Sequence, residues 1–429
     1  MTIPLIAIGL LLLFMLLGVP VAWSFAGVLL YLVWAYDTNT ATLLLQGYRS
    51  LDSVILLALP LFVLAGYLMQ SGGIAQRLIT FIEHMMRGRK GGLGASMVMS
   101  STVFGAISGT ATAAIASVGT IMIDPLSKRG YDRGYSSALL GLSSLIGILI
   151  PPSITLILFG VVTRQSITAL FAATIVPGLM LALGLILYNR IVFHNRPEGT
   201  GLPLEKGVSR LTLTWRALPG LALPFIILGG IYGGYFTPTE AAAIAVVSAT
   251  LIGFFIYRDL TLRKFRDSLV AAGETTGTII LILLFSFMIG RILAFEGVPQ
   301  DLTRAVSQVT DERILILLMV NLFLIFVGMV MDDLSVTVVI APLFMPLMQL
   351  HGVDPVHYGA IVACSVVIGA NSPPVAPCLY MACRIGKVSV HHSIRPAILM
   401  ILTVAVPVAL LVTFVPAFSL WMPRLLGFM

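Results

Sequence analysis

The feature that most constrains this chain is the recurrence of apolar runs about as long as a bilayer is thick. Such runs recur from Pro4 to Met429, and a helix needs roughly 20 apolar residues to cross the hydrocarbon core. Charged residues make up 10% of the 429 residues, against about 25% in an ordinary soluble domain. Because so few polar residues cannot cover a soluble surface, we expect an all-α integral membrane protein in a lipid bilayer.

Twelve apolar segments are predicted, six in each half of the chain, with a polar connector over residues 194–216 between the halves. The first half contains segments 3–17, 20–36, 53–69, 94–123, 136–162 and 168–193. The second half contains segments 217–236, 241–257, 269–295, 314–347, 357–382 and 394–420.

The basic residues predict the topology, because Lys and Arg favour cytoplasmic loops. Segment 94–123 has a Lys/Arg-rich loop at both ends, whereas segment 314–347 has a Lys/Arg-poor loop at both ends. A segment with both ends on one side must enter and return, so these two are expected to be re-entrant helical hairpins from opposite faces. The other ten segments span, five per half, which inverts the second half and places both termini outside the cytoplasm.

An internal duplication is indicated by matches between the two halves. The pair Pro151-Pro152 recurs 222 residues later at Pro373-Pro374, and Gly147 then aligns with Gly369. Further collinear matches at offsets of 222 or 224 are Gly130 with Gly352, Asp132 with Asp354, Ala138 with Ala360, Ile146 with Ile368, Gly66 with Gly290, Gly73 with Gly297 and Leu78 with Leu302. Two inverted repeats of this kind are common in secondary transporters, with substrate sites near the midplane; duplicated membrane proteins also include channels.

Two motifs in the first half favour a cation site. SGTATAA (108–114) lies in the middle of the first hairpin, and its hydroxyls and free backbone oxygens suit a hard cation. GILIPPS (147–153) interrupts a spanning segment, because two prolines lack the donors that upstream carbonyls need. The alternatives are a small-residue packing patch and a simple proline kink.

Two motifs in the second half favour cation and substrate binding. MDDLS (331–335) places two acids in an apolar hairpin, where ionisable residues are costly and mark function; the alternative is a hairpin tip that reaches water. GANSPPVAP (369–377) repeats the proline break but adds Asn371 and Ser372, which can bind carboxylate or hydroxyl groups. Arg291, near the end of a span, either holds an anion or extends to the interface.

Other classes of protein are disfavoured. The sequence contains no nucleotide-binding GxxxxGK[ST] loop and no GxSxG or HExxH motif, so we expect neither an enzyme nor ATP-driven transport. The net charge of +7 lies in membrane loops rather than in a nucleic-acid patch. The three cysteines match no metal or disulfide framework. The first apolar run lacks the features of a cleaved signal peptide and is expected to span.

These motifs together resemble those of the large membrane subunit (the DctM-type M subunit) of tripartite ATP-independent periplasmic (TRAP) transporters. The resemblance covers essentially the whole chain and rests on ALPLFVLAG (58–66), FGAISGTATA (104–113), TPTEAAA (237–243), GMVMDDLS (328–335) and GANSPPVAP, in this order. It implies an elevator mechanism in which a transport domain slides against a fixed scaffold. Residues 1–93 and 217–313 would be scaffold helices, and 94–193 and 314–429 would hold the hairpins, broken helices and following spans.

The resemblance also implies site residues and at least two sodium ions. The first sodium site would use Ser108 and Thr110 from the hairpin and backbone oxygens of Gly147, Ile150 and Pro152. The repeat relation places the second sodium site at Asp332, Gly369, Ser372 and Pro374. Substrate would lie between the two sites, near Thr112, Asp333 and Asn371, with Arg291 as a further candidate.

The family implies partners and a location as well. A sodium gradient would drive uptake of an organic acid, such as a C4-dicarboxylate or sialic acid, that a periplasmic substrate-binding protein delivers. Because the chain begins at its first span, we expect the small four-helix membrane subunit to be a separate partner. The location would be the bacterial inner membrane, with periplasmic termini. A stand-alone ion-coupled carrier, a channel and, remotely, an intramembrane enzyme are the alternatives.

Overall fold

The computed structural model describes residues 2–86, 91–194, 210–373 and 375–429, and every regular element in these ranges is helical. The predicted all-α class is therefore confirmed for this part of the chain. Six helices in it are long and apolar enough to cross a membrane, and a bent pair, Arg133–Leu149 with Ile154–Thr163, makes a possible seventh. The six are Val54–Ser71, Ile167–Val192, Leu211–Tyr232, Pro238–Ile256, Leu262–Phe295 and Val390–Phe414.

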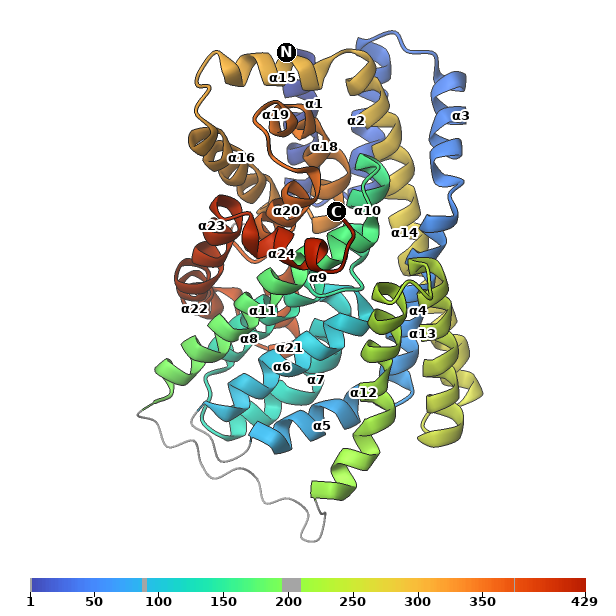
Figure 1. Cartoon of the computed structure of the whole chain (residues 1–429), viewed down its shortest axis with the longest axis vertical. Helices are drawn as coiled ribbons and strands as arrows, with labels where there is room; N and C mark the ends of the chain where they lie inside the picture. The colour runs from blue at the N-terminus through green and yellow to red at the C-terminus, as the bar shows by residue number, and fades with distance from the viewer. Residues whose placement is uncertain (1, 87–90, 195–209, 374) are drawn as a thin grey trace.

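One group of helices runs along one side of the molecule (Figure 1). Its members are α1 (Thr2–Leu16), α2 (Val21–Ala35), α3 (Thr40–Leu51), α4 (Ala58–Ser71), α12 (Arg210–Tyr232), α13 (Pro238–Leu251) and α14 (Leu262–Phe295). A 3₁₀ turn, η1 (Val54–Leu57), precedes α4, and a π-helical turn, η2 (Ile252–Ile256), extends α13. The α13 start is a capping box, in which the Glu240 carboxylate accepts from the Thr237 backbone N–H at 2.8 Å. TPTEAAA thus has a structural capping role.

Three segments that the sequence assigned to loops are amphipathic helices instead. They are α3, α5 (Ile74–Met86) and α15 (Val298–Ser307). Each carries a charged or polar face on a helix that is apolar on the other side, so a search for uniformly apolar runs passes over it. The sequence also starts α12 and α14 seven residues too late, because their first turns are polar.

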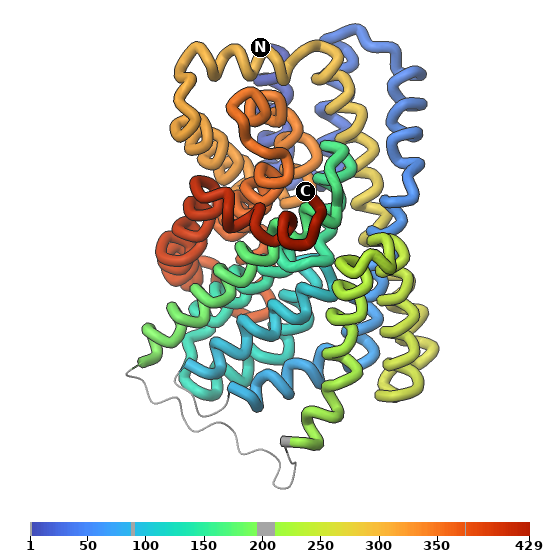
Figure 2. The backbone as a smooth tube through the Cα atoms, viewed as in Figure 1, coloured from blue at the N-terminus to red at the C-terminus, as the bar shows by residue number. Residues whose placement is uncertain are grey.

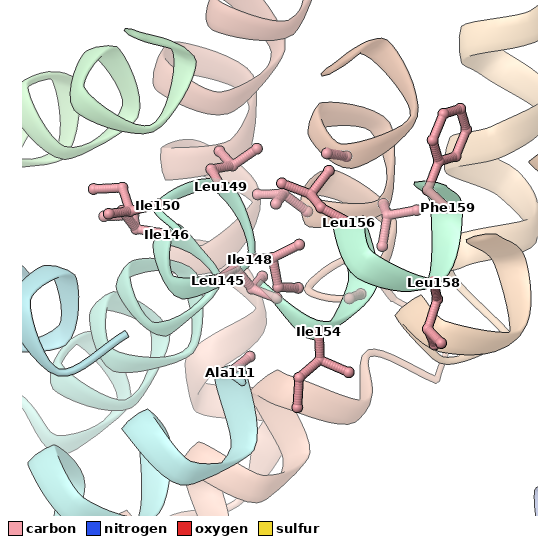
Figure 3. Close-up of a cluster of buried hydrophobic side chains, with 14 of the residues drawn as sticks. Ala111, Leu145, Ile146, Ile148, Leu149, Ile150, Ile154, Leu156, Leu158 and Phe159 are labelled. Atoms are coloured by element: carbon pink, nitrogen blue, oxygen red, sulfur yellow. The ribbon is translucent and has the colours of Figure 1, made fainter. Parts of the chain in front are cut away.

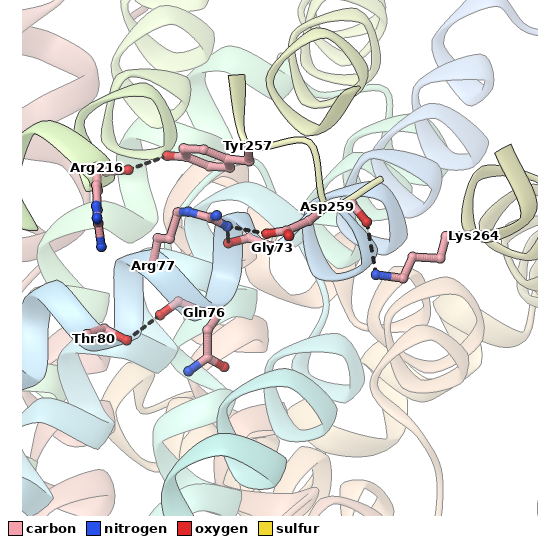
Figure 4. A network of polar contacts seen from close by, with 8 residues as sticks. All are labelled: Gly73, Gln76, Arg77, Thr80, Arg216, Tyr257, Asp259 and Lys264. Atoms are coloured by element: carbon pink, nitrogen blue, oxygen red, sulfur yellow. Dashed lines mark hydrogen bonds and ion pairs between the residues drawn. The ribbon is translucent and has the colours of Figure 1, made fainter. Parts of the chain in front are cut away.

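Helix α5 is joined by polar contacts to the start of α14 (Figure 4). The Arg77 guanidinium pairs with the Asp259 carboxylate, donates to the Gly73 carbonyl at 3.1 Å and lies 4.1 Å from the centre of the Tyr257 ring. The Tyr257 hydroxyl in turn donates to the Arg216 carbonyl at 2.7 Å. One cluster therefore ties the α4–α5 corner to the beginnings of α12 and α14.

Two helical hairpins and two interrupted helices form the rest of the interior. The first hairpin is α6 (Gly92–Ser108) with α7 (Ala111–Lys128), and the second is α16 (Arg313–Gly328) returning through α17 (Asp333–Ser335), η3 (Val336–Ile340), α18 (Ala341–Leu343) and α19 (Met345–Leu350). The first broken helix is α8 (Arg133–Ser144) and α9 (Ile146–Leu149) followed by α10 (Ile154–Thr163), with a bend of 43°. The second is α20 (Pro355–Gly369) followed by α21 (Pro377–Gly386).

Helix α11 (Ile167–Val192) and the C-terminal helices pack around these elements. The sequence predicted one final segment over 394–420, but the structure has α22 (Val390–Met400), η4 (Ile401–Ala405) and α23 (Val406–Phe414), then a separate α24 (Ala417–Leu425). The break falls at Val415, immediately before Pro416, which lacks the backbone N–H that a continuous helix needs. Helix α24 folds back onto α11, and the tube in Figure 2 ends there.

Most residue pairs matched between the two halves occupy similar places. Gly73 and Gly297 both adopt positive φ at the corner before an amphipathic helix, and Gly130 and Gly352 both do so before a broken helix. Asp132 and Asp354 cap the first turns of α8 and α20. Gly66 and Gly290 differ, because a Cβ on Gly66 would meet Ser108 whereas one on Gly290 would meet nothing within 4 Å.

The outer surface is apolar, as expected for a chain that lipid surrounds. Large side chains on α2 and α12 are strongly exposed, among them Trp34 at 79% and Phe225 at 77%. Such a density of exposed aromatic and aliphatic groups is rare on soluble monomers. The fold therefore presents its apolar side chains both to the interior and to the surroundings.

Candidate functional site

The tip of the first hairpin packs directly against the first helix break. A Cβ on Gly105 would lie 2.4 Å from the Gly147 Cα, so only glycine allows this approach of two backbones. Beyond it, the Gly109 carbonyl accepts from the Ile154 backbone N–H at 3.3 Å. Figure 3 shows Ala111, the first residue of α7, beside Ile154 at this junction. The hairpin tip and the break thus form one polar junction inside an apolar cluster.

The residues predicted for the first sodium site lie together at this junction. Ser108 is buried, and its hydroxyl donates to the Thr110 carbonyl at 3.5 Å. The Thr110 side chain accepts from the Ala113 N–H at 3.3 Å and so caps α7. Across the junction, Pro151 and Pro152 have no N–H for the carbonyls of Gly147 and Ile148, four residues upstream of each.

A hard cation fits the chemistry of these atoms better than a transition metal does. Hydroxyl and carbonyl oxygens are the ligands that such cations prefer. Within the described ranges, no group of three or more His, Cys, Asp and Glu side chains is arranged to hold a metal ion. The junction therefore offers neutral oxygen donors and no thiolate or imidazole.

The second hairpin meets the second break in the same way. A Cβ on Gly369 would lie 2.7 Å from the Cα and carbonyl carbon of Gly328 and 2.8 Å from the Ile325 oxygen. The tip that follows is residues 329–332, between α16 and α17. Each hairpin thus approaches its own broken helix through a contact between two glycines.

The two acids of MDDLS have different partners. Asp332 caps α17 and binds Ser335, whose hydroxyl and backbone N–H both donate to its carboxylate. Asp333 accepts from the Thr155 hydroxyl at 2.6 Å. Because Thr155 lies in α10, that bond joins the second hairpin to the first broken helix.

The second break differs from the first in how its carbonyls are used. The Gly369 carbonyl accepts from the Ser372 N–H at 2.9 Å, and the Ala370 carbonyl accepts from the Cys378 N–H at 3.3 Å. The Ser372 hydroxyl donates to the Ile368 carbonyl at 2.7 Å, which leaves its oxygen able to accept. Pro374, also predicted here, lies outside the described residues.

Asn371 is the least satisfied polar side chain of this region. It is fully buried, and neither its amide oxygen nor its amide nitrogen has a hydrogen-bond partner among the residues that the structure describes. Its oxygen lies next to Gly141 of α8, 2.7 Å from where a Cβ on that glycine would be. A buried amide without partners costs about 1–3 kcal/mol, so this position is suited to a ligand that supplies the missing hydrogen bonds.

The structure does not bring two other predicted residues into this cluster. Thr112 is exposed on the first turn of α7, and Arg291 is exposed on α14. Arg291 lies on the helix face opposite Ile289 and Leu293, which point into the interior. Neither residue makes a side-chain hydrogen bond or ion pair within the described part of the chain.

Sequence reasoning missed several residues that shape the site. Thr155 stands two residues beyond GILIPPS and carries no signal of its own, because its partner lies 178 positions away. Ser335 closes a D-x-x-S capping pattern with Asp332, which the sequence does display. Gly105 and Gly328 could have been found from the repeat relation, since each lies at nearly the same distance before its hairpin tip.

A separate apolar cavity of about 300 Å³ lies behind the second hairpin. It is bounded by α1, α2, α14 and α15 on one side and by α16 and η3 on the other. Its lining includes Leu11, Phe25, Leu293, Leu302, Phe323 and Ile340. It contains no acid or base, so it is distinct from the polar junctions at the hairpin tips.

Comparisons with known proteins identify relatives over nearly the full length. A family model described as "Tripartite ATP-independent periplasmic transporter, DctM component" matches residues 8–418. The C4-dicarboxylate TRAP transporter large permease DctM of Pseudomonas aeruginosa is 35% identical, covering 94% of this chain and 93% of that one. The sialic acid TRAP transporter large permease SiaM of Vibrio cholerae is 33% identical, covering 95% of both.

Two further comparisons concern length and fold. The isethionate TRAP transporter permease DctMQ of Oleidesulfovibrio alaskensis is 32% identical over 95% of this chain, which spans 64% of that relative's length. Among solved structures, the Alcanivorax borkumensis YdaH transporter matches with a TM-score of 0.61 at 14% identity, over 88% of each chain. That likeness concerns the fold alone.

Proposed function

Because this chain belongs to the DctM family of TRAP transporter large permeases, we propose that it couples uptake of an organic acid to a sodium gradient. It is a multi-span protein of the bacterial inner membrane and a transporter permease rather than an enzyme. The observation that carries the sodium proposal is the pair of hairpin tips, each seated on a helix break through a glycine contact. Irregular backbone at membrane depth is tolerated where it is buried in protein or lines a wet cavity.

Two sodium sites are proposed at these junctions. The first uses Ser108 and Thr110 with carbonyls of the first break, including Gly147, Ile150 and Pro152. The second uses Asp332 and Ser372 with Gly369 and Pro374, and there the carboxylate compensates for carbonyls already used within the break. Because the two junctions have unequal donors, we expect unequal sodium affinities.

Substrate is proposed to lie between the junctions, against Asn371 and Asp333. The unpartnered buried amide of Asn371 supports this placement, since a carboxylate or hydroxyl of the substrate would satisfy it. Relatives named for C4-dicarboxylate, sialic acid and isethionate transport support an organic anion. An anion is costly in a low-dielectric interior unless a cation lies beside it. Thr112 and Arg291 remain less central candidates, because both are exposed.

The two halves are proposed to be inverted repeats, with ten spans and two re-entrant hairpins. Equivalent glycine conformations, equivalent Asp caps and the two glycine contacts support the repeat. Shorter apolar helices, such as Thr2–Leu16 and Pro355–Gly369, would complete the ten spans in a tilted or broken form. An odd number of spans per half keeps both termini on the periplasmic side.

Movement is proposed to follow an elevator mechanism. The hairpins and broken helices pack on each other and on α11, whereas α1–α4 and α12–α14 form a second group. The amphipathic helices α5 and α15 connect the groups in sequence. Amphipathic helices that lie at the membrane–water interface would let one group of helices slide while the other stays fixed.

The partners proposed are those that the family name implies. A periplasmic binding protein would deliver the substrate, and a small membrane subunit would complete the scaffold. Four helices are proposed for that subunit. A stand-alone ion-coupled carrier would need no binding protein, and a channel would show no fixed ratio of sodium to substrate.

Uptake into proteoliposomes tests this function. Vesicles containing the chain and its small partner would receive radiolabelled succinate, N-acetylneuraminate or isethionate, with and without a sodium gradient and the cognate binding protein. We expect uptake that requires both. Uptake that needs sodium alone would favour the stand-alone carrier, and uptake indifferent to sodium would refute the coupling.

A further inference from the structure

Among the described residues, one side-chain hydrogen bond joins the second hairpin to the first broken helix. The Thr155 hydroxyl donates to the Asp333 carboxylate at 2.6 Å, and Thr155 is only 1% exposed. A hydrogen bond between buried groups gains in strength where water is excluded. This bond therefore couples the two halves at the centre of the proposed site.

The Thr155 hydroxyl is directed away from its own helix. A buried helical threonine commonly donates to a carbonyl one turn back, as Thr174 of α11 does to Leu170 and Phe171 at 3.3 Å. Thr155 is the second residue of α10, so no turn of that helix precedes it, and its hydroxyl donates to a residue 178 positions away. The bond to Asp333 therefore links α10 to the second hairpin rather than one turn of α10 to the next.

Within the described ranges, the first hairpin and the second broken helix share no equivalent of this bond. Asp333 is the first residue after the cap of α17, and the residue in that place in α7 is Ala111, whose methyl group cannot accept a hydrogen bond. Thr155 is the second residue after the Ser153 cap, and Cys378 is second after Ala376 in α21. In the described part of the chain, a bond of this kind therefore joins the second hairpin to the first broken helix but not the first hairpin to the second broken helix.

The second hairpin also borders the apolar cavity described above. The π-helical segment η3 follows Asp333 closely, and π-helical turns often occur at functional sites. Val339 and Ile340 of η3 line the apolar cavity of about 300 Å³. The second hairpin is thus bonded to α10 at Asp333 and borders the apolar cavity at Val339 and Ile340.

We propose that Thr155 is a positioning residue that holds Asp333 and thereby closes the second hairpin over the substrate. This proposal rests on the proposed function. Through this bond, a sodium ion that orders the first break would also favour closure of the second hairpin. The coupling between cation and substrate would then pass from α10 to α17.

A set of matched variants tests the role in the complete reconstituted complex. Thr155→Val removes the donor and keeps the shape, Thr155→Ser keeps the donor, and Thr174→Val removes a buried hydroxyl that bonds only within its helix. The substrate is whichever of succinate, N-acetylneuraminate and isethionate the wild type takes up. For that substrate, Thr155→Val should raise the concentration that gives half-maximal uptake about tenfold to a hundredfold. The maximal rate should change far less, and Thr155→Ser should restore most of the affinity.

A second measurement reports hairpin closure without transport. Val330→Cys, in a background in which Cys364, Cys378 and Cys383 are alanine, places a thiol on the tip of the second hairpin. We expect its rate of labelling by a water-soluble maleimide to rise in Thr155→Val, and to stay low in Thr155→Ser and Thr174→Val. The proposal would be overturned if labelling in Thr155→Val equalled that in the wild type. It would also be overturned if Thr174→Val lost as much substrate affinity as Thr155→Val does. Sodium-independent uptake by the wild type would instead refute the proposed function.

Discussion

The substitution Gly105→Ala tests whether the hairpin must touch the helix break. The added Cβ would lie 2.4 Å from the Gly147 Cα and 3.0 Å from its nitrogen, and both are backbone atoms that cannot rotate away. Real Cβ atoms essentially never approach closer than 3.0 Å. The first hairpin must therefore retreat by about 0.6 Å, the difference between these two distances.

The expected cost follows from two opposing effects. Overpacking of this kind destabilises by about 1–3 kcal/mol, whereas alanine in a helix gains about 0.5–1 kcal/mol over glycine. A matched control, Gly277→Ala in α14, keeps only the gain, because its Cβ would meet nothing within 4 Å. Gly328→Ala is an intermediate case, since its nearest contact would be the Gly369 Cα at 3.3 Å.

The assay is the sodium dependence of uptake, measured beside thermal unfolding. A retreat of the hairpin moves Ser108 and Thr110 away from the carbonyls of the first break. We expect Gly105→Ala to need about tenfold more sodium for half-maximal uptake. The sodium requirement of Gly277→Ala should equal that of the wild type, and the increase in Gly328→Ala should be smaller than in Gly105→Ala. If Gly105→Ala and Gly277→Ala have the same sodium dependence, the first hairpin tip is not part of a cation site.

Two further predictions concern Asn371 and the Arg77 cluster. Asn371→Leu should raise the ligand-free melting temperature by removing an unsatisfied buried amide, and should abolish the thermal shift that substrate produces; lower stability with normal uptake would contradict this reading. The Arg77–Asp259 pair is partly exposed, at 28% and 44% for the two side chains, so a double-mutant cycle of Arg77→Gln and Asp259→Asn should give a coupling of about 0–1 kcal/mol that vanishes at high salt. A salt-insensitive coupling above that range would show that the pair holds the helices together.

The sequence predicted the parts of the site that depend on local chemistry. Adjacent prolines remove backbone donors wherever they occur, so both breaks could be placed from Pro151-Pro152 and Pro373-Pro374 alone. Glycine and hydroxyl residues at Ser108–Thr110 likewise indicated the tip of the first hairpin. The structure has helix pairs at these places, α6–α7 and α16–α19, whereas their re-entrant character stays a prediction.

What the sequence could not predict depends on how distant segments pack. Thr155 resembles any threonine in a helix until Asp333 is placed beside it. The unpartnered state of Asn371 is likewise visible only when its neighbours are known. The helices α3, α5 and α15 were missed for a different reason, because their polar faces resemble loops when hydrophobicity alone is considered.

The account is tested most directly by the accumulation of substrate at steady state as the sodium gradient is varied. The measurement would use vesicles that contain the chain and the small membrane subunit, with the membrane potential clamped at zero. The binding protein would be added together with whichever of succinate, N-acetylneuraminate and isethionate the wild type transports. The accumulation ratio is the substrate concentration inside the vesicles divided by that outside, and the sodium ratio is the sodium concentration outside divided by that inside. Two sodium sites predict that the logarithm of the first rises with the logarithm of the second with a slope of at least about two. A slope of zero would contradict sodium coupling, and a slope of one would contradict the paired sites at the two hairpin tips.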